Sequence, residues 1–257
     1  MIRAILQHGL PAGLIAFCVV DTHLHALFVG DRGDVGEAMR RIELSCHRRL
    51  GLRHRFDGAR IRPVRDQRHL RSVIPYILDQ VVRHELVTDP LQEGSSLHDL
   101  LGLRVPGGKL ARGFTAEQPR IVVTEYAEKL GVTPQQWATW GEPLAAEDLK
   151  YLLDATCAAF AIRSVRPRLA VHRPVRAAMV QAAGRHSARA IARATGLSHQ
   201  TVRRLLEVPV PDGWLFAIRG QVWLRRAAAE AAAAATEREW GPRTAEAPAV
   251  GSPPWSD

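Results

Sequence analysis

Two histidines separated by one residue, His23 and His25, stand in a short apolar run with the composition of a β-strand. Successive side chains of a strand point to opposite faces, so both imidazoles would project from the same face. Paired neutral imidazoles suit a divalent metal ion. The alternative is two histidines on a solvated strand face, which a chain with 11 histidines can produce by chance.

Tyr76 and Gln80 are four residues apart in a stretch with helical periodicity, so both would lie on one helix face, with Arg83 and His84 a turn further on. A metal held by two imidazoles and an amide oxygen would leave coordination positions open beside the phenol. A phenol with its ordinary pKa of about 10 is a weak nucleophile, but a metal that polarises the attacked phosphate lowers the barrier. The spacing indicates phosphoryl transfer; the alternative is a core aromatic at Tyr76 and a surface amide at Gln80.

The segment 187–206 has the pattern of a helix-turn-helix. Gly196 supplies the left-handed turn residue, and Ser198 can cap the second helix. The outer side of that helix then carries side chains that suit the major groove, where glutamine pairs with adenine and arginine with guanine or phosphate. These candidate DNA-binding residues are His199, Gln200, Arg203 and Arg204. The alternative is an ordinary helical hairpin with a solvated charged face.

The elements that must position these residues follow from periodicity. We predict strands over 14–20, 23–29 and 58–64, a helix over 36–50, and a helix from 67 to about 86 that Asp66 caps and Pro75 kinks. Strands mixed with helices predict an α+β domain in which helices cover an antiparallel sheet. Later patterns are mainly helical, with helices expected over 95–101, 115–130, 133–140 and 145–162.

These patterns divide the chain into four parts. We expect the α+β domain over 1–103, a helical connector over 104–144 and an all-α DNA-binding region over 145–240. The last part, 241–257, is rich in Pro, Gly, Ala and Ser and predicts a disordered tail.

Composition narrows the class of partner. The chain has 257 residues with 35 Lys and Arg against 26 Asp and Glu, a net charge of +9 that favours a polyanionic partner, although GC-rich coding bias also enriches arginine. Three widely spaced cysteines exclude a disulfide scaffold and a cysteine zinc ribbon and fit a reducing cytosol. No apolar run is long enough to span a membrane. We therefore expect a cytoplasmic, nucleoid-associated protein that does not contact membranes.

Four segments resemble, in order, those of the single-tyrosine HUH transposases, particularly the REP-associated tyrosine transposases. They are AFCVVDTHLHALFV (16–29), RHRFDGARIRPV (53–64), YILDQVVRHELV (76–87) and GSSLHDLLGLR (94–104), about a third of the chain. The resemblance implies an HUH-like fold in which His23, His25 and Gln80 bind Mg²⁺ or Mn²⁺ and Tyr76 is the nucleophile. It also implies cleavage and rejoining of single-stranded or hairpin DNA through a 5′-phosphotyrosine, in an active site often assembled in a homodimer.

The chain also departs from that family. Val20, Asp21 and Thr22 replace the Met-Pro-Asn that usually precedes the first motif histidine, and Val81 replaces a common proline. Only 15 residues precede Ala16, so the first strand of the family is missing unless Met1 to Leu14 substitutes for it or the true start lies upstream. Two hypotheses follow: a transposase that cleaves single strands, or a catalytically degenerate relative that only binds duplex DNA sequence-specifically through 187–206.

Overall fold

The computed structural model describes residues 1–20, 23–51, 53, 56–84, 94–106, 142–165 and 172–240. Its elements, in chain order, are α1 (Ile2–Gly9), η1 (Leu10–Ala12), β1 (Leu14–Val20), β2 (His23–Phe28), α2 (Arg32–Leu50), α3 (Gln67–Leu78), α4 (Gln80–Arg83), α5 (Leu97–Leu100), η2 (Ala146–Tyr151), α9 (Leu152–Phe160), α10 (Arg173–Ala182), α11 (Ala188–Thr195), α12 (His199–Leu206) and α13 (Asp212–Trp240). The described part is mixed α+β and mostly helical, which confirms the predicted class.

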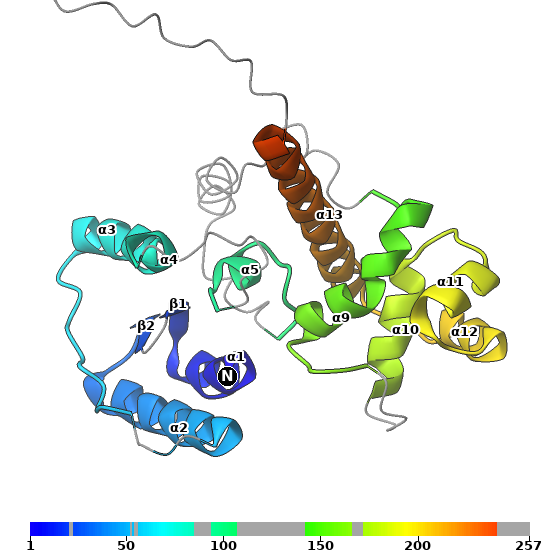
Figure 1. Cartoon of the computed structure of the whole chain (residues 1–257). Coiled ribbons are helices and arrows are strands. Elements are labelled where there is room, and N and C mark those ends of the chain that lie inside the picture. Colours follow the sequence, from blue (N-terminus) through cyan, green and yellow to red (C-terminus); the bar gives the residue numbers. More distant parts are fainter. Residues whose placement is uncertain are drawn as a thin grey trace, which may run out of the picture.

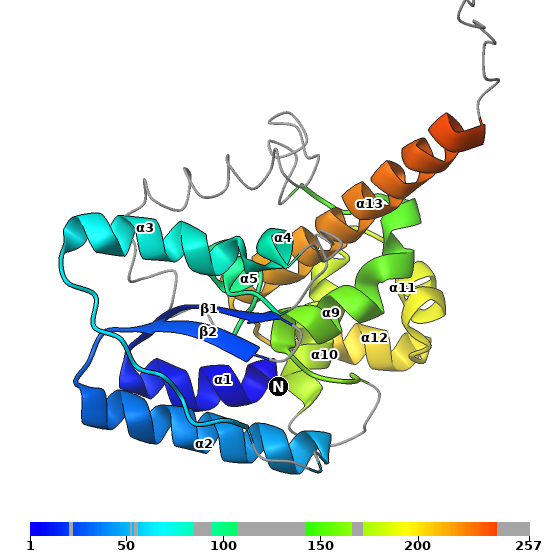
Figure 2. The ribbon, with the colours of Figure 1, turned by 60° about the vertical axis from the view of Figure 1, so that its left-hand side comes forward.

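The sheet is an antiparallel pair of strands that lies between two helical layers (Figure 2). Helices α1 and α2 cover one face, and α3 and α4 cover the other. Phe17 of β1 packs with Ile5 and Ile42 on the α1–α2 side, while its neighbour Cys18 packs with Ile77 on the α3 side. Because side chains alternate along β1, Phe17 faces the core beneath α1 and α2, and Cys18 faces α3. The histidines of β2 lie on the same face as Cys18.

Gly13 fixes the geometry at the open end of this hairpin. Its φ is 82°, in the left-handed region, and its carbonyl accepts the backbone N–H of Val29 at 2.8 Å. A Cβ at this position would collide with the carbonyl oxygen of Val29, so only glycine fits without displacing the end of β2.

One predicted strand is absent from the described residues, and the N-terminal segment does not replace the family's first strand. Residues 58–64 belong to no strand and are exposed except for half-buried Ile61, because the alternation is weak and Pro63 lacks a donor for a ladder hydrogen bond. The segment Met1 to Leu14, the possible substitute for that strand, instead contains helix α1, which buries Ala4, Ile5 and Leu6. The described sheet thus has two strands.

The predicted long helix over 67–86 is divided in two. Asp66 accepts the N–H of His69 at 2.7 Å and caps α3, as predicted, but the interruption falls at Asp79 rather than at Pro75. Pro75 remains inside α3, and its carbonyl accepts the N–H of Asp79 at 2.8 Å. The displaced turn sets the direction of α4 and of the residues that follow it.

Helix α5 connects the sheet to the C-terminal helices. Ser96 receives the N–H of Phe17 on its hydroxyl at 3.0 Å, and the side-chain nitrogen of Gln221 on α13 lies 2.8 Å from Nδ1 of His98. Asp99 and Arg104 form a buried ion pair at 2.6 Å in the same region. Buried polar contacts around α5 therefore connect the sheet to the C-terminal helices.

The C-terminal region packs around α13 (Figure 1). Helices α9 and α10 lie against α13, and their shared core includes Leu152, Met179 and Ile218. Helix α12 packs on α10, where the side-chain nitrogen of Gln181 donates to the carbonyls of Leu205 and Val208, at the end of α12. Gln181 thereby supplies the cap that holds α12 in place.

Some of the predicted elements lie in parts of the chain that the structure does not describe. The helices expected over 115–130 and 133–140, most of the connector and the tail over 241–257 lie outside the described residues. Within the part of the chain that is described, none of the helices combines the length and apolar character of a membrane span.

Candidate functional site

The two motif histidines lie side by side on the α3–α4 face of the sheet. His23 is paired with Val20 and His25 with Cys18, so both side chains share the face that carries Cys18. Their ring centroids are 4.9 Å apart in an edge-on arrangement. The alternation expected of the strand is therefore realised in the structure.

A third imidazole joins them from the helical layer. His84 follows α4, and its ring centroid lies 4.8 Å from that of His23. One ligand nitrogen from each of His23, His25 and His84 lies within 4.8 Å of the other two. The antiparallel pairing and the short helix α4 thus bring three histidines from distant parts of the sequence into one cluster, which we call the histidine triad.

His25 is the member of the triad that is prepared for a metal. Its Nε2 is enclosed and has no hydrogen-bond partner in the described structure. Burial, with smaller contributions from the charges of His23 and His84, holds the pKa of His25 below its usual value. A neutral imidazole with a free nitrogen lone pair is the form that coordinates a metal.

Tyr76 stands beside the triad and is accessible. Its ring centroid is 5.8 Å from that of His25, and the side chain is 43% exposed. The guanidinium of Arg83 lies 4.8 Å from the centre of the same ring. A phenol is therefore held between a candidate metal centre and a permanent positive charge.

Gln80 begins α4 in the same helical layer, and its side chain is directed back to α3. It is 2% exposed, and its side-chain nitrogen donates to the backbone carbonyl of Tyr76 at 2.8 Å. Its role as a metal ligand stays a prediction. In the structure the position four residues further on, His84, contributes the imidazole that reaches His23.

Helical spacing predicts Arg83 and His84 a turn beyond Gln80, but neither is among the site residues predicted from the sequence. The signal was the helical spacing, since His84 follows Tyr76 by two steps of four residues and Gln80 by one. Whether that face contacts β2 depends on how the helix packs on the sheet, and the spacing of residues along the chain does not predict that packing.

The predicted DNA-binding residues lie together on the outer side of α12. Gln200, Arg203 and Arg204 are exposed and His199 is half-buried. The opposite side of the helix buries Val202 and Leu205. Ser198 accepts the N–H of Thr201 at 3.1 Å and begins the helix.

The connection between α11 and α12 is tight. Gly196 has φ of 70°, and its N–H donates to the carbonyl of Ala192 at 2.9 Å. Ile191 of α11 is buried in the same core as Val202 of α12, so the two helices pack against each other.

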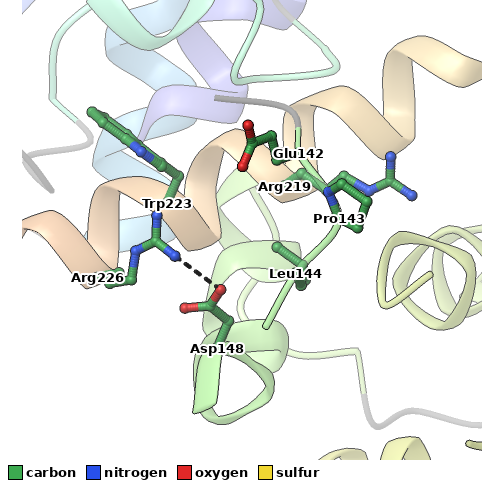
Figure 3. Close-up of a pocket in the computed structure, with 7 residues that line it drawn as sticks. All are labelled: Glu142, Pro143, Leu144, Asp148, Arg219, Trp223 and Arg226. Atoms are coloured by element: carbon green, nitrogen blue, oxygen red, sulfur yellow. Dashed lines mark hydrogen bonds and ion pairs between the residues drawn. The ribbon is translucent and has the colours of Figure 1, made fainter. Parts of the chain in front are cut away.

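A small hollow between the 142–148 segment and α13 is separate from both groups (Figure 3). Its lining includes Trp223, Arg219 and Asp148, whose carboxylate forms an ion pair with Arg226 at 3.2 Å. The volume is about 30 Å³, room for about one water molecule, so the hollow is too small for a substrate.

Comparison of the chain with models of known protein families, with curated proteins and with solved structures gives no match. Function must therefore be argued from the residues of the site itself.

Proposed function

We propose that this protein is a metal-dependent enzyme that cleaves and rejoins single-stranded DNA through Tyr76. The observation that carries the proposal is the convergence of the histidine triad with an accessible phenol on one face of the sheet. His23, His25 and His84 would hold a divalent metal, which would supply stabilisation of the charge that develops on the attacked phosphate.

The reaction conserves a phosphodiester bond. The phenolic oxygen of Tyr76 forms a bond to phosphorus while the bond from phosphorus to the 3′-oxygen breaks, which leaves a 5′-phosphotyrosine and a free 3′-hydroxyl. The phenol loses its proton and the departing 3′-oxygen gains one, so no net proton is consumed. Reversal by a 3′-hydroxyl rejoins the strand, with no further source of energy.

Arg83 is placed to assist this step. Its guanidinium lies 4.8 Å from the centre of the Tyr76 ring, so its positive charge would stabilise negative charge that develops on the phenol and on a phosphate bound beside it. The charge of arginine is permanent at any physiological pH. Attraction to a polyanionic strand also raises the local concentration of substrate.

The region of α10 to α12 supports a second contact with DNA. Between residues 172 and 208 the chain has seven arginines and one acidic residue, Glu207. Two of the arginines, Arg203 and Arg204, are exposed on α12. We propose that α11 and α12 act as a helix-turn-helix that places α12 in the major groove of duplex DNA beside the cleaved strand.

A covalent protein–DNA adduct tests the catalytic proposal. Full-length protein is incubated with a labelled hairpin oligonucleotide and Mn²⁺, then resolved on a denaturing gel. The wild type is expected to form an adduct, and Tyr76→Phe, which removes only the hydroxyl, is expected to form none. Tyr151→Phe, in the helical region, is the matched control and is expected to behave as wild type.

Two results would contradict the proposal in different ways. An adduct that persists in Tyr76→Phe means that another residue is the nucleophile. Absence of any adduct in the wild type, with duplex binding intact and with Mg²⁺, Mn²⁺ and Zn²⁺ each supplied, favours the second hypothesis, a DNA-binding protein without catalysis.

A further inference from the structure

We propose that the histidine triad is a three-imidazole site that selects a borderline divalent transition ion, of which Zn²⁺ is the representative, over Mg²⁺. This inference concerns the metal bound by the same site as in the proposed function. It shares that site with the proposed function but does not require DNA cleavage. It assigns His84 as the third ligand.

The donor set carries the argument. Among the described residues, the cluster consists of three imidazoles and includes no carboxylate. Imidazole nitrogen suits Zn²⁺, Co²⁺ and Ni²⁺, whereas Mg²⁺ prefers six oxygen ligands in octahedral geometry. A set of three nitrogens that leaves one position open is also the form of many catalytic zinc sites.

The spacing of the nitrogens fits such an ion after a small closure. In a tetrahedral site with Zn–N bonds of about 2.0–2.1 Å the nitrogens lie about 3.4 Å apart. Nitrogens that lie within 4.8 Å of one another therefore have to move by on the order of 0.8 Å each. His23 is exposed and His84 is half-buried. The side chain of His25, whose Nε2 is buried, is the most enclosed of the three.

His25 Nε2 provides a second, independent observation. It is a buried polar atom without a hydrogen-bond partner in the described structure, and burying such an atom unpaired has a free-energy cost. A metal bond to this nitrogen would remove that cost. One ligand nitrogen of His25 also lies within 4.8 Å of a ligand nitrogen of His23 and of His84.

Gln80 is the alternative third ligand, and the structure separates it from His84. Its side-chain nitrogen donates to the carbonyl of Tyr76, four residues earlier on α3. Its side chain is 2% exposed, whereas the ring of His84 reaches His23. We therefore assign His84, the residue after α4, as the third ligand instead of Gln80, the first residue of α4.

The test is metal binding by the full chain, measured by calorimetry after removal of bound metal with a chelator. Zn²⁺ is expected to bind at one site at least about 100-fold more tightly than Mg²⁺. Loss of a ligand should cost on the order of 100-fold in Zn²⁺ affinity for His84→Ala. Co²⁺ provides a second readout, because a tetrahedral site gives intense visible absorption that His84→Ala should abolish.

Two variants serve as controls. Gln80→Met removes the amide but keeps the shape of the buried side chain, and it should retain Zn²⁺ affinity and the Co²⁺ spectrum. His69→Ala removes an exposed histidine on α3 outside the triad and should also bind like wild type. Circular dichroism of each variant establishes that the fold is intact.

The outcomes separate this inference from the proposed function. Equal affinity for Mg²⁺ and Zn²⁺, or loss of binding in Gln80→Met but not in His84→Ala, overturns the three-imidazole site while DNA cleavage can still be observed. Tight Zn²⁺ binding that depends on His84, without any DNA adduct, leaves the site standing and overturns the cleavage.

Discussion

Cys18 of β1 is paired directly with His25 of β2, so the thiol and the imidazole occupy the same face of the sheet. The two groups nevertheless differ in their fitness as ligands. Burial raises the pKa of Cys18 to about 11, only partly offset by its hydrogen bond with the backbone of Val81. Since the thiolate is the form that binds metals and reacts, Cys18 acts as a small apolar residue beside the triad.

Thiol reactivity provides the first prediction. Cys18 and Cys46 are buried and burial raises the pKa of each, whereas Cys157 is half-buried. Iodoacetamide at neutral pH is expected to modify Cys157 first, as followed by mass spectrometry of peptides. Early modification of Cys18 in folded protein would contradict the packing of β1 against α3. Cys18→Ala should bind Zn²⁺ within about twofold of wild type, because the thiol is not a ligand.

Arg83→Gln tests the charge beside the phenol. The variant loses the guanidinium that faces Tyr76 but keeps the three imidazoles, so metal affinity is expected to stay at the wild-type value. Removing one preorganised group that stabilises transition-state charge lowers the rate on the order of 100-fold. Single-turnover adduct formation measures this rate. Arg83→Lys, which keeps a positive charge, should recover part of it, and an unchanged rate in Arg83→Gln would exclude Arg83 from the step.

The two exposed arginines of α12 are expected to differ. If Arg203 contacts a base, Arg203→Ala costs about 1–3 kcal/mol at one position of the target and leaves other sequences unaffected. If Arg204 contacts phosphate, Arg204→Ala weakens every sequence alike and reduces the dependence of affinity on salt. Fluorescence anisotropy with competitor duplexes over a range of salt concentrations distinguishes the two. Duplex affinity unchanged in the double variant would refute the proposed use of α12.

The pair of Asp99 and Arg104 offers a stability test. Both side chains are at most 1% exposed, and they meet at 2.6 Å. Removing one partner of a buried pair leaves the other charge uncompensated, so Arg104→Met is expected to lower the free energy of unfolding by roughly 3–5 kcal/mol. The double variant Asp99→Leu with Arg104→Met should recover much of that loss. Urea denaturation measures both, and equal losses in the single and double variants would contradict this explanation.

The pKa of His25 predicts how the stability of the metal-free protein depends on pH. The pKa is lowered in the folded state, chiefly by burial, so below about pH 6.5 the unfolded chain binds a proton there more readily than the folded chain does. The free energy of unfolding should therefore fall as the pH is lowered from 6.5. His25→Asn should show a shallower dependence over the same range in chelator-treated protein. Equal slopes would mean that His25 titrates normally in the fold.

Local features of the protein could be predicted from its sequence because they depend on neighbours along the chain. The spacing of His23 and His25 places both imidazoles on one strand face wherever that strand lies. Ser198 and Gly196 likewise fix the start of α12 and the turn before it through hydrogen bonds and backbone conformation that span only a few residues.

The tertiary structure decided the contacts between distant segments. Residues 58–64 alternate only weakly and Pro63 cannot donate to a ladder, but whether another strand pairs with them depends on the rest of the sheet, and in the structure they belong to no strand. The break at Asp79 and the packing of α4 on the sheet bring His84 to His23, 61 positions earlier in the chain. The nitrogen of Gln80 instead donates to Tyr76 of α3. Helical periodicity predicts which residues share one face of a helix. Which of them contacts the strand depends on the angle at which the helix packs on the sheet, and the whole core determines that angle.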